Sequence, residues 1–453
     1  MKRILVANRG EIACRILRTC RRLGLETVAV YSEADAEALH VSVADLALPI
    51  GGATPAQSYL AGESIIKAAR ASGADAIHPG YGFLSENADF ARAVQAAGMG
   101  WIGPDPKTIE DMADKGCARL LAEAAGLPVL PGSARFASGD ITGVEKAART
   151  LGFPLLVKAS AGGGGIGMRR VDRVEDLALA VASTQTMAAR AFGDGTVYLE
   201  RYIAEARHVE VQVFGLGDGH AVHLHERDCS VQRRFQKIVE ESPAPQLPTA
   251  TREAMCQAAV ALCTQERYRG AGTVEFVLDT ETRNFYFLEM NTRIQVEHPV
   301  TEMVSGLDLV ELQIAIAGDR PLAVRAQSDV KVSGHSIECR LYAERPAKGF
   351  LPAPGMLSRF DIACGGPQVR IDTGVRSGDR ITHFYDPMIA KIIVAGSDRA
   401  ETIERMLSTL GSISIGGIET NLAFLQRVVG HAAFRAGEVR TGFVDRHKKD
   451  LLG

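Results

Sequence analysis

The sequence predicts an α/β protein whose N-terminal parallel sheet is followed by α+β structure with antiparallel strands. Short apolar strands alternate with amphipathic helices over about the first 110 residues. A small unit then carries four consecutive glycines, and beyond it hairpins and alternating strands dominate. We expect a Rossmann-like N-terminal domain over 1–112, a linker helix and connector over 113–129, a glycine-rich lid domain over 130–204, a central domain over 205–330 and a C-terminal β-rich domain over 331–447.

The N-terminal elements follow a strand–helix repeat. The segment "RILVAN" predicts a short strand, and "EIACRILRTCRRLG" predicts a helix because its apolar residues recur at helical spacing before Gly24. The segments "ETVAVYS", "DAIHPG" and "GMGWIG" repeat the strand pattern, with helical segments between them. Such alternation is typical of a parallel sheet flanked by helices.

The middle and C-terminal elements predict a different architecture. The segment "DMADKGCARLLAEAAG" predicts one helix that ends at Gly126, and "PVLPG" predicts a connector. The small unit has strands at "FPLLVKAS", "GMRRV" and "TVYLERYI" and one long helix. Beyond it we expect helices at "TREAMCQAAVALCTQ", "DLVELQIAIAG" and "RAETIERMLSTLG", and a strand at "GHSIECRLYAE".

Composition narrows the classes of function. The chain of 453 residues has a net charge of −3 and is 46% apolar, which predicts several globular domains and no nucleic-acid partner. The eight cysteines include no CxxC pair, so we interpret them as reduced thiols and expect neither a disulfide framework nor a zinc site. No apolar run is long enough for a membrane span or a signal peptide. We therefore expect a cytoplasmic protein with no membrane partner.

The glycine-rich stretch "KASAGGGGIGMRRV", residues 158–171, does not fit the common phosphate loops. A Rossmann fingerprint opens a helix, but the residues after these glycines predict a strand. A Walker A loop carries its lysine after the glycines, whereas Lys158 precedes them, and no HRD or DFG motif of a protein kinase is present. One remaining interpretation is a hairpin tip that closes over a triphosphate with Lys158 as a point charge. The alternative is a loop without a ligand.

A second candidate site lies in "TVEFVLDTETRNFYFLEMN", residues 273–291. If Asp279 pairs with Phe285 across the turn, Glu275 lies opposite Glu289, with Asn291 on the same face. Facing carboxylates repel unless a cation lies between them, and oxygen ligands favour Mg²⁺ or Mn²⁺.

The same register makes further pairs that test it. It places Phe276 opposite Leu288 and Leu278 opposite Tyr286 on an apolar face. It also places Val277, Phe285 and Phe287 on the face of the carboxylates, which argues against the alternative of a solvated face. An oxygen-ligated metal, a glycine lid and a lysine together describe the ATP-grasp arrangement, in which a small and a large domain close on ATP.

Several longer motifs carry a family resemblance. The segments "ANRGEIACRI", "HPGYGFLSE", "RHVEVQVF", "ERDCSVQRRFQKIVEESPAP", "NTRIQVEHPVTEM" and "GHSIECR" resemble biotin carboxylase, the ATP-grasp component of biotin-dependent carboxylases. The resemblance runs in order from the first strand to about residue 445. It implies that ATP phosphorylates bicarbonate to carboxyphosphate and that the released CO₂ carboxylates N1 of biotin. It also implies a homodimer.

The resemblance also implies a role for individual residues. The ATP contacts would be Lys115, Lys158, Gly164, Gly165, Glu200, Arg201, Tyr202, Ile203, His208, Gln232, Phe235, Glu275 and Glu289. The metal ligands, for two ions, would be Glu275, Glu289 and Asn291. Bicarbonate would bind to Lys237, Arg293, Gln295, Val296 and Glu297, and biotin to Arg340. Four of these residues, Lys237, Arg293, Glu297 and Arg340, would be catalytic.

The side-chain types of the catalytic residues suit the roles that the resemblance implies. The guanidinium of Arg293 matches a three-oxygen anion, and Arg340 would stabilise the biotin enolate. Glu297 would take the bicarbonate proton and then, by way of the phosphate, the proton of biotin N1, which requires surroundings that raise its pKa.

Each role has a simpler alternative. Arg293 and Glu297 could form a helical ion pair, Arg340 could pair with Glu338 along a strand, and His208 could be an ordinary strand residue.

Two departures and one absence complete the expectations. The glycine loop has Ile166 where many relatives have a basic residue, and it resembles urea carboxylase loops, although "NTRIQVEHPVTEM" is similar to the acyl-CoA carboxylase branch. Phe235 stands where His or Asn is common. The sequence has no Ala/Val-Met-Lys-Met biotinylation site, so we expect biotin on a separate carrier protein and a separate carboxyltransferase subunit. The final acceptor stays open among acetyl-CoA, another acyl-CoA, a urea-like compound and a keto acid. The alternatives are another ATP-grasp ligase and a silent ATP-binding regulatory subunit.

Overall fold

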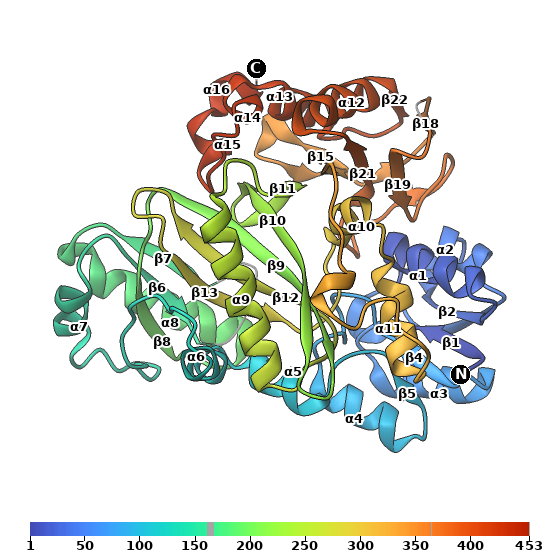
Figure 1. Ribbon diagram of the computed structural model, residues 1–453, viewed down its shortest axis with the longest axis horizontal. Helices are drawn as coiled ribbons and strands as arrows, with labels where there is room; N and C mark the ends of the chain where they lie inside the picture. The colour runs from blue at the N-terminus through green and yellow to red at the C-terminus, as the bar shows by residue number, and fades with distance from the viewer. Residues whose placement is uncertain (161–166, 364, 453) are drawn as a thin grey trace.

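The computed structural model describes residues 1–160, 167–363 and 365–452 (Figure 1). Its N-terminal part is a five-stranded parallel sheet in the order β3-β2-β1-β4-β5, as predicted. The strands are β1 (Arg3–Val6), β2 (Glu26–Ser32), β3 (Leu46–Gly51), β4 (Ala76–His78) and β5 (Gly100–Trp101). The accompanying helices are α1 (Gly10–Arg22), α2 (Leu39–Val43), α3 (Gly62–Ser72) and α4 (Ala88–Ala96). Ile12, Ile16 and Cys20 of α1 are buried in a common core with β1.

The predicted single helix before Gly126 is two helices. They are α5 (Pro106–Ala113) and α6 (Lys115–Ala124), and the chain is extended at Asp114 between them. The Asp114 carboxylate accepts a hydrogen bond from the backbone N–H of Cys117 at 2.7 Å. This N-cap satisfies a backbone donor of α6 that has no partner within the helix, so a new helix begins there.

The small unit is a three-stranded antiparallel sheet in the order β7-β6-β8. It contains β6 (Leu155–Ala159), β7 (Met168–Val171) and β8 (Val197–Arg201), with α7 (Val144–Leu151) and α8 (Leu177–Phe192) packed against it. The segment after the glycines is a strand, as predicted, and Lys158 pairs with Met168. Gly164, Gly165 and Ile166 lie outside the described residues.

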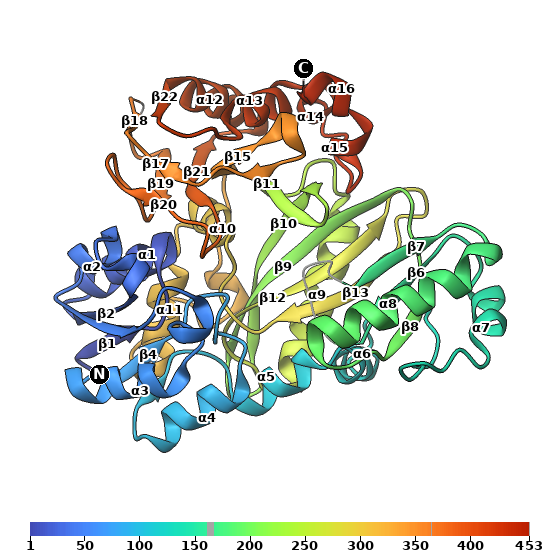
Figure 2. The same cartoon turned by 180° about the vertical axis from the view of Figure 1, so that it is seen from behind.

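One large antiparallel sheet runs through the centre of the molecule, in the order β13-β12-β9-β10-β11-β14-β21-β19 (Figures 1 and 2). It joins strands expected in the central domain to strands expected in the C-terminal domain through the pairing of β11 with β14. The strands are β9 (Ala206–Leu216), β10 (Ala221–Arg233), β11 (Gln236–Ser242), β12 (Arg269–Asp279), β13 (Phe285–Asn291), β14 (His335–Tyr342), β19 (Val369–Thr373) and β21 (Met388–Gly396).

Helices and short strands complete the second half of the chain. The helices are α9 (Thr249–Gln265), α10 (His298–Ser305), α11 (Leu309–Ala317), α12 (Arg399–Ser412), α13 (Leu422–Gly430), α14 (Ala432–Arg435), α15 (Phe443–Arg446) and α16 (Lys448–Leu452). The short strands are β15 (Glu344–Arg345), β16 (Leu351–Pro352), β17 (Gly355–Met356), β18 (Arg359–Ile362), β20 (Arg380–Ile381) and β22 (Ile413–Gly416). Among the described residues, no helix combines the length and apolar character needed to cross a membrane.

The β12–β13 hairpin confirms one predicted pair and corrects others. Glu275 lies opposite Glu289, but a β-bulge follows Glu275, so Phe276 lies opposite Phe287 rather than Leu288. Leu278 lies opposite Phe285 rather than Tyr286, and Asp279 does not pair with Phe285.

A shift of one residue exchanges the two faces of a strand. Phe285 and Phe287 therefore pack with Phe276 in the core, and are not on the carboxylate face as the sequence predicted. Val277 packs with Tyr286 and Leu288 in a separate apolar cluster.

Candidate functional site

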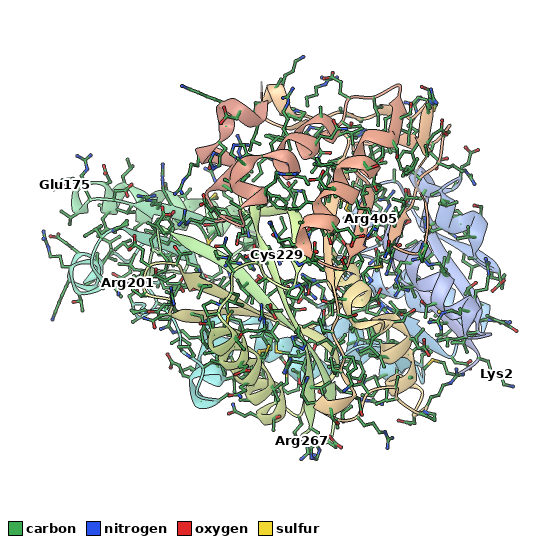
Figure 3. The ribbon with its side chains drawn as sticks, turned by 45° about the horizontal axis from the view of Figure 1, so that its top comes forward. Lys2, Glu175, Arg201, Cys229, Arg267 and Arg405 are labelled. Carbon is green, nitrogen blue, oxygen red and sulfur yellow. The ribbon has the colours of Figure 1, made fainter. Side chains whose placement is uncertain are left out.

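A cavity of about 340 Å³ lies between the small unit and the large sheet. In Figure 3, Arg201 marks the end of β8 in the small unit and Cys229 marks the middle of the large sheet. Most of the predicted site residues line this one cavity. Its lining comprises Lys115, Lys158, Met168, His208, Gln232, Phe235, Gln236, Lys237, Glu275, Leu288, Glu289, Asn291, Arg293, Gln295, Val296, Glu297 and Arg340.

The predicted metal ligands lie together on the β12–β13 hairpin, where the side-chain oxygen of Asn291 accepts a hydrogen bond from Arg293. Glu275 and Glu289 are opposite each other on β12 and β13, and the Asn291 amide donates to Glu275 Oε1 at 2.9 Å. Burial and the charge of Glu275 raise the pKa of Glu289. Two facing carboxylates with an amide beside them suit a hard divalent cation, which lowers their repulsion. The donor set therefore fits Mg²⁺ or Mn²⁺.

Two lysines converge at the small-unit side of the cavity. Lys158 donates to Glu200 Oε2 at 2.7 Å. Burial acts to lower the pKa of Lys158, but the charge of Glu200 outweighs burial and the pKa is raised. Burial and the charge of Lys158 lower the pKa of Lys115, at the start of α6. Their convergence creates a site in which a polyanion such as a triphosphate relieves the repulsion between two ammonium groups.

The segment 200–203 does not line the cavity as a whole. Glu200 reaches it through Lys158, whereas Arg201 is exposed. Tyr202 stacks under the guanidinium of Arg170, with 4.5 Å from its Cζ to the ring centroid. Ile203 packs against the apolar cluster that contains Leu288, which itself lines the cavity.

His208 is partly buried, whereas Phe235 is exposed. The Nε2 atom of His208 lies 2.8 Å from Glu275 Oε2, and its Nδ1 lies 2.9 Å from the Gln232 amide nitrogen. Burial lowers its pKa, but the charge of Glu275 prevails and the pKa is raised. His208 therefore contacts a predicted metal ligand, and its role in ATP binding stays a prediction. Phe235 is 53% exposed in the β10–β11 turn, with a positive φ of 68°.

Lys237 is the centre of the charged network. Its ammonium lies 2.6 Å from Glu210, 2.8 Å from Glu275 and 2.7 Å from Glu297. Burial opposes its charge, but the three carboxylates raise its pKa well above the ordinary value. Burial likewise acts to raise the pKa of Glu275, but Lys237 and His208 outweigh it and the pKa lies well below its usual value. One cation thus links the metal-ligand group to the predicted base.

Glu297 is ionised in this arrangement. Burial acts to raise its pKa, but the charges of Lys237, Arg340 and Arg227 outweigh burial and lower it. The expectation that its surroundings raise the pKa is therefore wrong for this state, because two of these cations contact the carboxylate directly. Proton acceptance by Glu297 requires that these contacts lengthen or pass to another anion.

The loop before α10 carries the predicted bicarbonate residues. It is not helical between 293 and 297, so the alternative of a helical ion pair is wrong. Arg293 donates to Glu86 at 2.9 Å and to the Asn291 side-chain oxygen at 2.7 Å. The Gln295 amide donates to Glu275 at 2.6 Å.

Arg340 approaches from β14. Its Nε donates to Glu240 at 2.6 Å and its Nη2 to Glu297 at 3.0 Å. The alternative pairing with Glu338 is absent from the described contacts of both residues.

Several residues that hold the site were not predicted. They are Glu86, Met168, Glu210, Arg227, Gln236, Glu240, Leu288 and Lys391. Arg227 is fully buried and donates to Glu210 at 2.6 Å and to Gln295 at 2.7 Å. Lys391, on β21, donates to the carbonyl of Val296 at 2.8 Å. Strand alternation within "ERDCSVQRRFQKIVEESPAP" could have indicated Arg227 and Glu240, but their partners depend on pairings between distant strands.

Three family models match the chain. They are described as the biotin carboxylase N-terminal domain, residues 1–109, the ATP-binding domain of the carbamoyl-phosphate synthase L chain, residues 114–325, and the biotin carboxylase C-terminal domain, residues 338–446. The chain is 50% identical over 452 residues to the biotin carboxylase of Halalkalibacterium halodurans, covering 100% of this chain and 99% of that protein. It is 49% identical over 452 residues to the methylcrotonoyl-CoA carboxylase subunit alpha of Arabidopsis thaliana, and spans 61% of the length of that relative.

Solved structures agree with these matches. The biotin carboxylase domain dimer of the 2-oxoglutarate carboxylase of Hydrogenobacter thermophilus, in complex with MgADP, ADP and bicarbonate, is 43% identical, with a TM-score of 0.95 over 99% of this chain and 98% of that one. A biotin carboxylase–β,γ-ATP complex from Campylobacter jejuni is 43% identical, with a TM-score of 0.94 over 98% of this chain and 99% of that one. The match extends over all the sheets described above.

Proposed function

Because the chain belongs to the biotin carboxylase family, we propose that it catalyses the ATP-dependent carboxylation of biotin by bicarbonate, giving ADP and phosphate. The observation that carries the proposal is the contact of Lys237 with both Glu275 and Glu297. This contact joins a carboxylate pair suited to a metal–nucleotide complex to a carboxylate suited to act as a base. Nucleotide chemistry and proton transfer thereby share one cavity.

In the first step, bicarbonate becomes a better nucleophile for the γ-phosphorus of ATP. Lys115 and Lys158 hold the phosphates, and Arg293, Gln295 and the backbone N–H of Val296 hold bicarbonate. A divalent cation held by Glu275, Glu289 and Asn291 supplies charge neutralisation for the phosphates when bound. Glu297 takes the bicarbonate proton, the bicarbonate oxygen bonds to the γ-phosphorus, and the bond to the β-phosphate oxygen breaks. The products are ADP and carboxyphosphate.

Competition for the neighbouring cations explains how Glu297 becomes basic enough to take the bicarbonate proton. Bicarbonate is a second anion beside Lys237 and Arg340 and competes with Glu297 for their charge. Each contact that passes from Glu297 to the substrate removes an interaction that lowers the pKa of Glu297. Substrate binding thereby raises the basicity of the group that must accept the proton.

In the second step, carboxyphosphate breaks into CO₂ and phosphate. Once Glu297 has released the bicarbonate proton to water, the phosphate takes the proton of biotin N1 and passes it to Glu297, while Arg340 stabilises the negative charge on the ureido oxygen. The N1 atom then bonds to the carbon of CO₂.

The assembly belongs to the same proposal. Biotin arrives on a separate carrier protein, a carboxyltransferase subunit uses the carboxybiotin, and two copies of the chain form a homodimer. The dimeric biotin carboxylase domain from Hydrogenobacter thermophilus supports the homodimer. The relatives named for methylcrotonoyl-CoA favour an acyl-CoA as the final acceptor. The division of the chain into domains over 1–112, 130–204, 205–330 and 331–447, with 113–129 as the linker, is likewise proposed.

ATP hydrolysis with and without bicarbonate and free biotin tests the function. We expect hydrolysis that requires bicarbonate and rises with biotin. Hydrolysis without any dependence on bicarbonate rejects the carboxylase reaction. Hydrolysis that needs bicarbonate but does not respond to biotin favours another ATP-grasp ligase.

A further inference from the structure

Two buried glutamates face each other beside the cavity. Glu240 on β11 and Glu338 on β14 are opposite in register, so their side chains project from the same face of the sheet. Both are fully buried. Arg340, two residues beyond Glu338 on β14, donates through Nε to Glu240 Oε1 at 2.6 Å. Glu338 is thus linked to the cavity through Glu240 and Arg340.

Three of the four oxygens of this pair receive no hydrogen bond. Among the described residues, no donor reaches Glu240 Oε2 or either oxygen of Glu338. If both carboxylates were ionised, two buried charges would share a single hydrogen-bond donor, Arg340. Such an arrangement lowers stability through desolvation of both charges and through their repulsion. A proton on one carboxyl group removes a charge and supplies a donor to the other.

Lys391, the cation on the neighbouring strand β21, contacts groups other than Glu338. Lys391 on β21 donates to the Val296 carbonyl at 2.8 Å and lies 3.1 Å from Glu11. It affects Glu338 through its charge, but no hydrogen bond between them is found in the described part of the chain. Lys391 therefore leaves the oxygens of Glu338 without a donor.

The charged groups with the largest effects on Glu338 come from four segments. They are Lys391 on β21, Glu240 on β11, Arg340 on β14 and Glu297 in the loop before α10. Burial raises the pKa of Glu338 well above its ordinary value, Lys391 opposes this rise and Glu240 adds to it. His298 of α10, which packs against β14, is held neutral because burial and Lys391 lower its pKa.

We propose that Glu338 is protonated and donates a hydrogen bond to Glu240 Oε2, so that Glu240 is fixed in the position from which it orients Arg340. Glu338 is then a positioning residue that acts through two other side chains. The consequence for biotin rests on the proposed function, whereas the protonation of Glu338 does not.

A pair of substitutions tests the positioning role. Glu338→Gln keeps a donor in place of the carboxyl proton, and we expect kcat/KM for biotin to stay near that of the wild type. Glu338→Met has a similar volume but no donor, and we expect roughly a tenfold loss in kcat/KM for biotin, the effect of one hydrogen bond to a charged group. The KM for ATP should not change in either variant. Equal losses in both variants, or no loss in the methionine variant, would overturn the role.

Infrared spectroscopy tests the protonation without any reaction. At about pH 8, where an exposed glutamate is ionised, the wild-type spectrum minus that of Glu338→Gln should contain the carbonyl band of a protonated carboxylic acid. Glu241→Gln is the matched control, because Glu241 is equally buried on β11 but pairs with His335 and Arg399 and has a lowered pKa. Its difference spectrum should lack the band.

The outcomes separate the two proposals. If the Glu338 difference spectrum also lacks the band, the protonation is wrong, whatever the activity. If the band is present in a protein that does not carboxylate biotin, the proposed function is wrong and the proton on Glu338 remains.

Discussion

Replacing Arg227 with methionine removes the cation from a buried polar cluster while keeping a long unbranched side chain. In the native protein its guanidinium donates to Glu210, Gln212, Thr273, Gln295 and Thr301, at 2.6 to 3.2 Å. The substitution leaves these acceptors buried with fewer donors. Loss of one partner of a buried ion pair costs about 3–5 kcal/mol.

The expected change in melting temperature follows from the length of the chain. Unfolding entropy is about 2.1 cal/mol/K per residue, or about 1 kcal/mol/K for 453 residues. The melting temperature of Arg227→Met should therefore fall by about 3–5 °C. The KM for bicarbonate should also rise, because Gln295 loses the donor that orients it. Arg227→Lys keeps the charge but not the fork of donors, so its melting temperature should lie between those of the wild type and Arg227→Met.

Scanning calorimetry measures the first effect, and Arg149→Met is the matched control. Arg149 is an exposed arginine paired with Glu145 one turn away on α7, and such a pair contributes less than about 1 kcal/mol. Its loss should change the melting temperature by less than about 1 °C. Equal melting temperatures for the Arg227 and Arg149 variants would refute the reasoning.

Other predictions follow from the site and its surroundings. Arg293→Ala and Glu297→Ala should each lower biotin-dependent turnover by roughly 10²–10⁴-fold while ATP binding, measured by calorimetry, persists; near-normal turnover in either variant contradicts its assigned role. Glu289→Gln should raise the Mg²⁺ concentration for half-maximal ATP hydrolysis more than roughly tenfold, whereas Glu281→Gln, in the exposed turn of the same hairpin, should not; equal Mg²⁺ curves contradict the metal site. Burial acts to raise the pKa of Asp308, but Arg15 and hydrogen bonds to the carboxylate lower it, so its contribution to stability is complete above the unfolded pKa of about 4 and is lost as the pH falls below it. Asp308→Asn should destabilise the protein at neutral pH and make acid denaturation less steep, and unchanged acid curves contradict this.

Local pattern was sufficient for most of the fold, because alternating strands and helices predicted the parallel sheet. The pair of Glu275 with Glu289 was predicted correctly although the pairing at the turn was not, because the bulge shifts the register by one residue between the turn and the carboxylates. The bulge after Glu275 could not be predicted, because alternation in the sequence counts residues evenly and a bulge inserts one residue into a single strand. The break at Asp114 was missed because the apolar spacing of α5 continues into α6, although an aspartate three residues before a backbone donor is a capping signal.

The polar network of the site depends on contacts between distant segments. Lys237 meets Glu210 because β9, β10 and β11 are neighbours, and it meets Glu297 because the loop before α10 lies over that face. Sequence alone gives no register between these strands. The low pKa of Glu297 also follows from this convergence of cations, which explains why the expectation of a raised pKa was wrong.

Transfer of radiolabelled bicarbonate to free biotin measures the central claim most directly. With ATP and Mg²⁺ present, label should accumulate on biotin as acid-labile carboxybiotin, and it should be absent when ATP is omitted or when Arg340 is replaced by methionine. Release of ADP with no label on biotin would contradict the claim that this cavity carboxylates biotin.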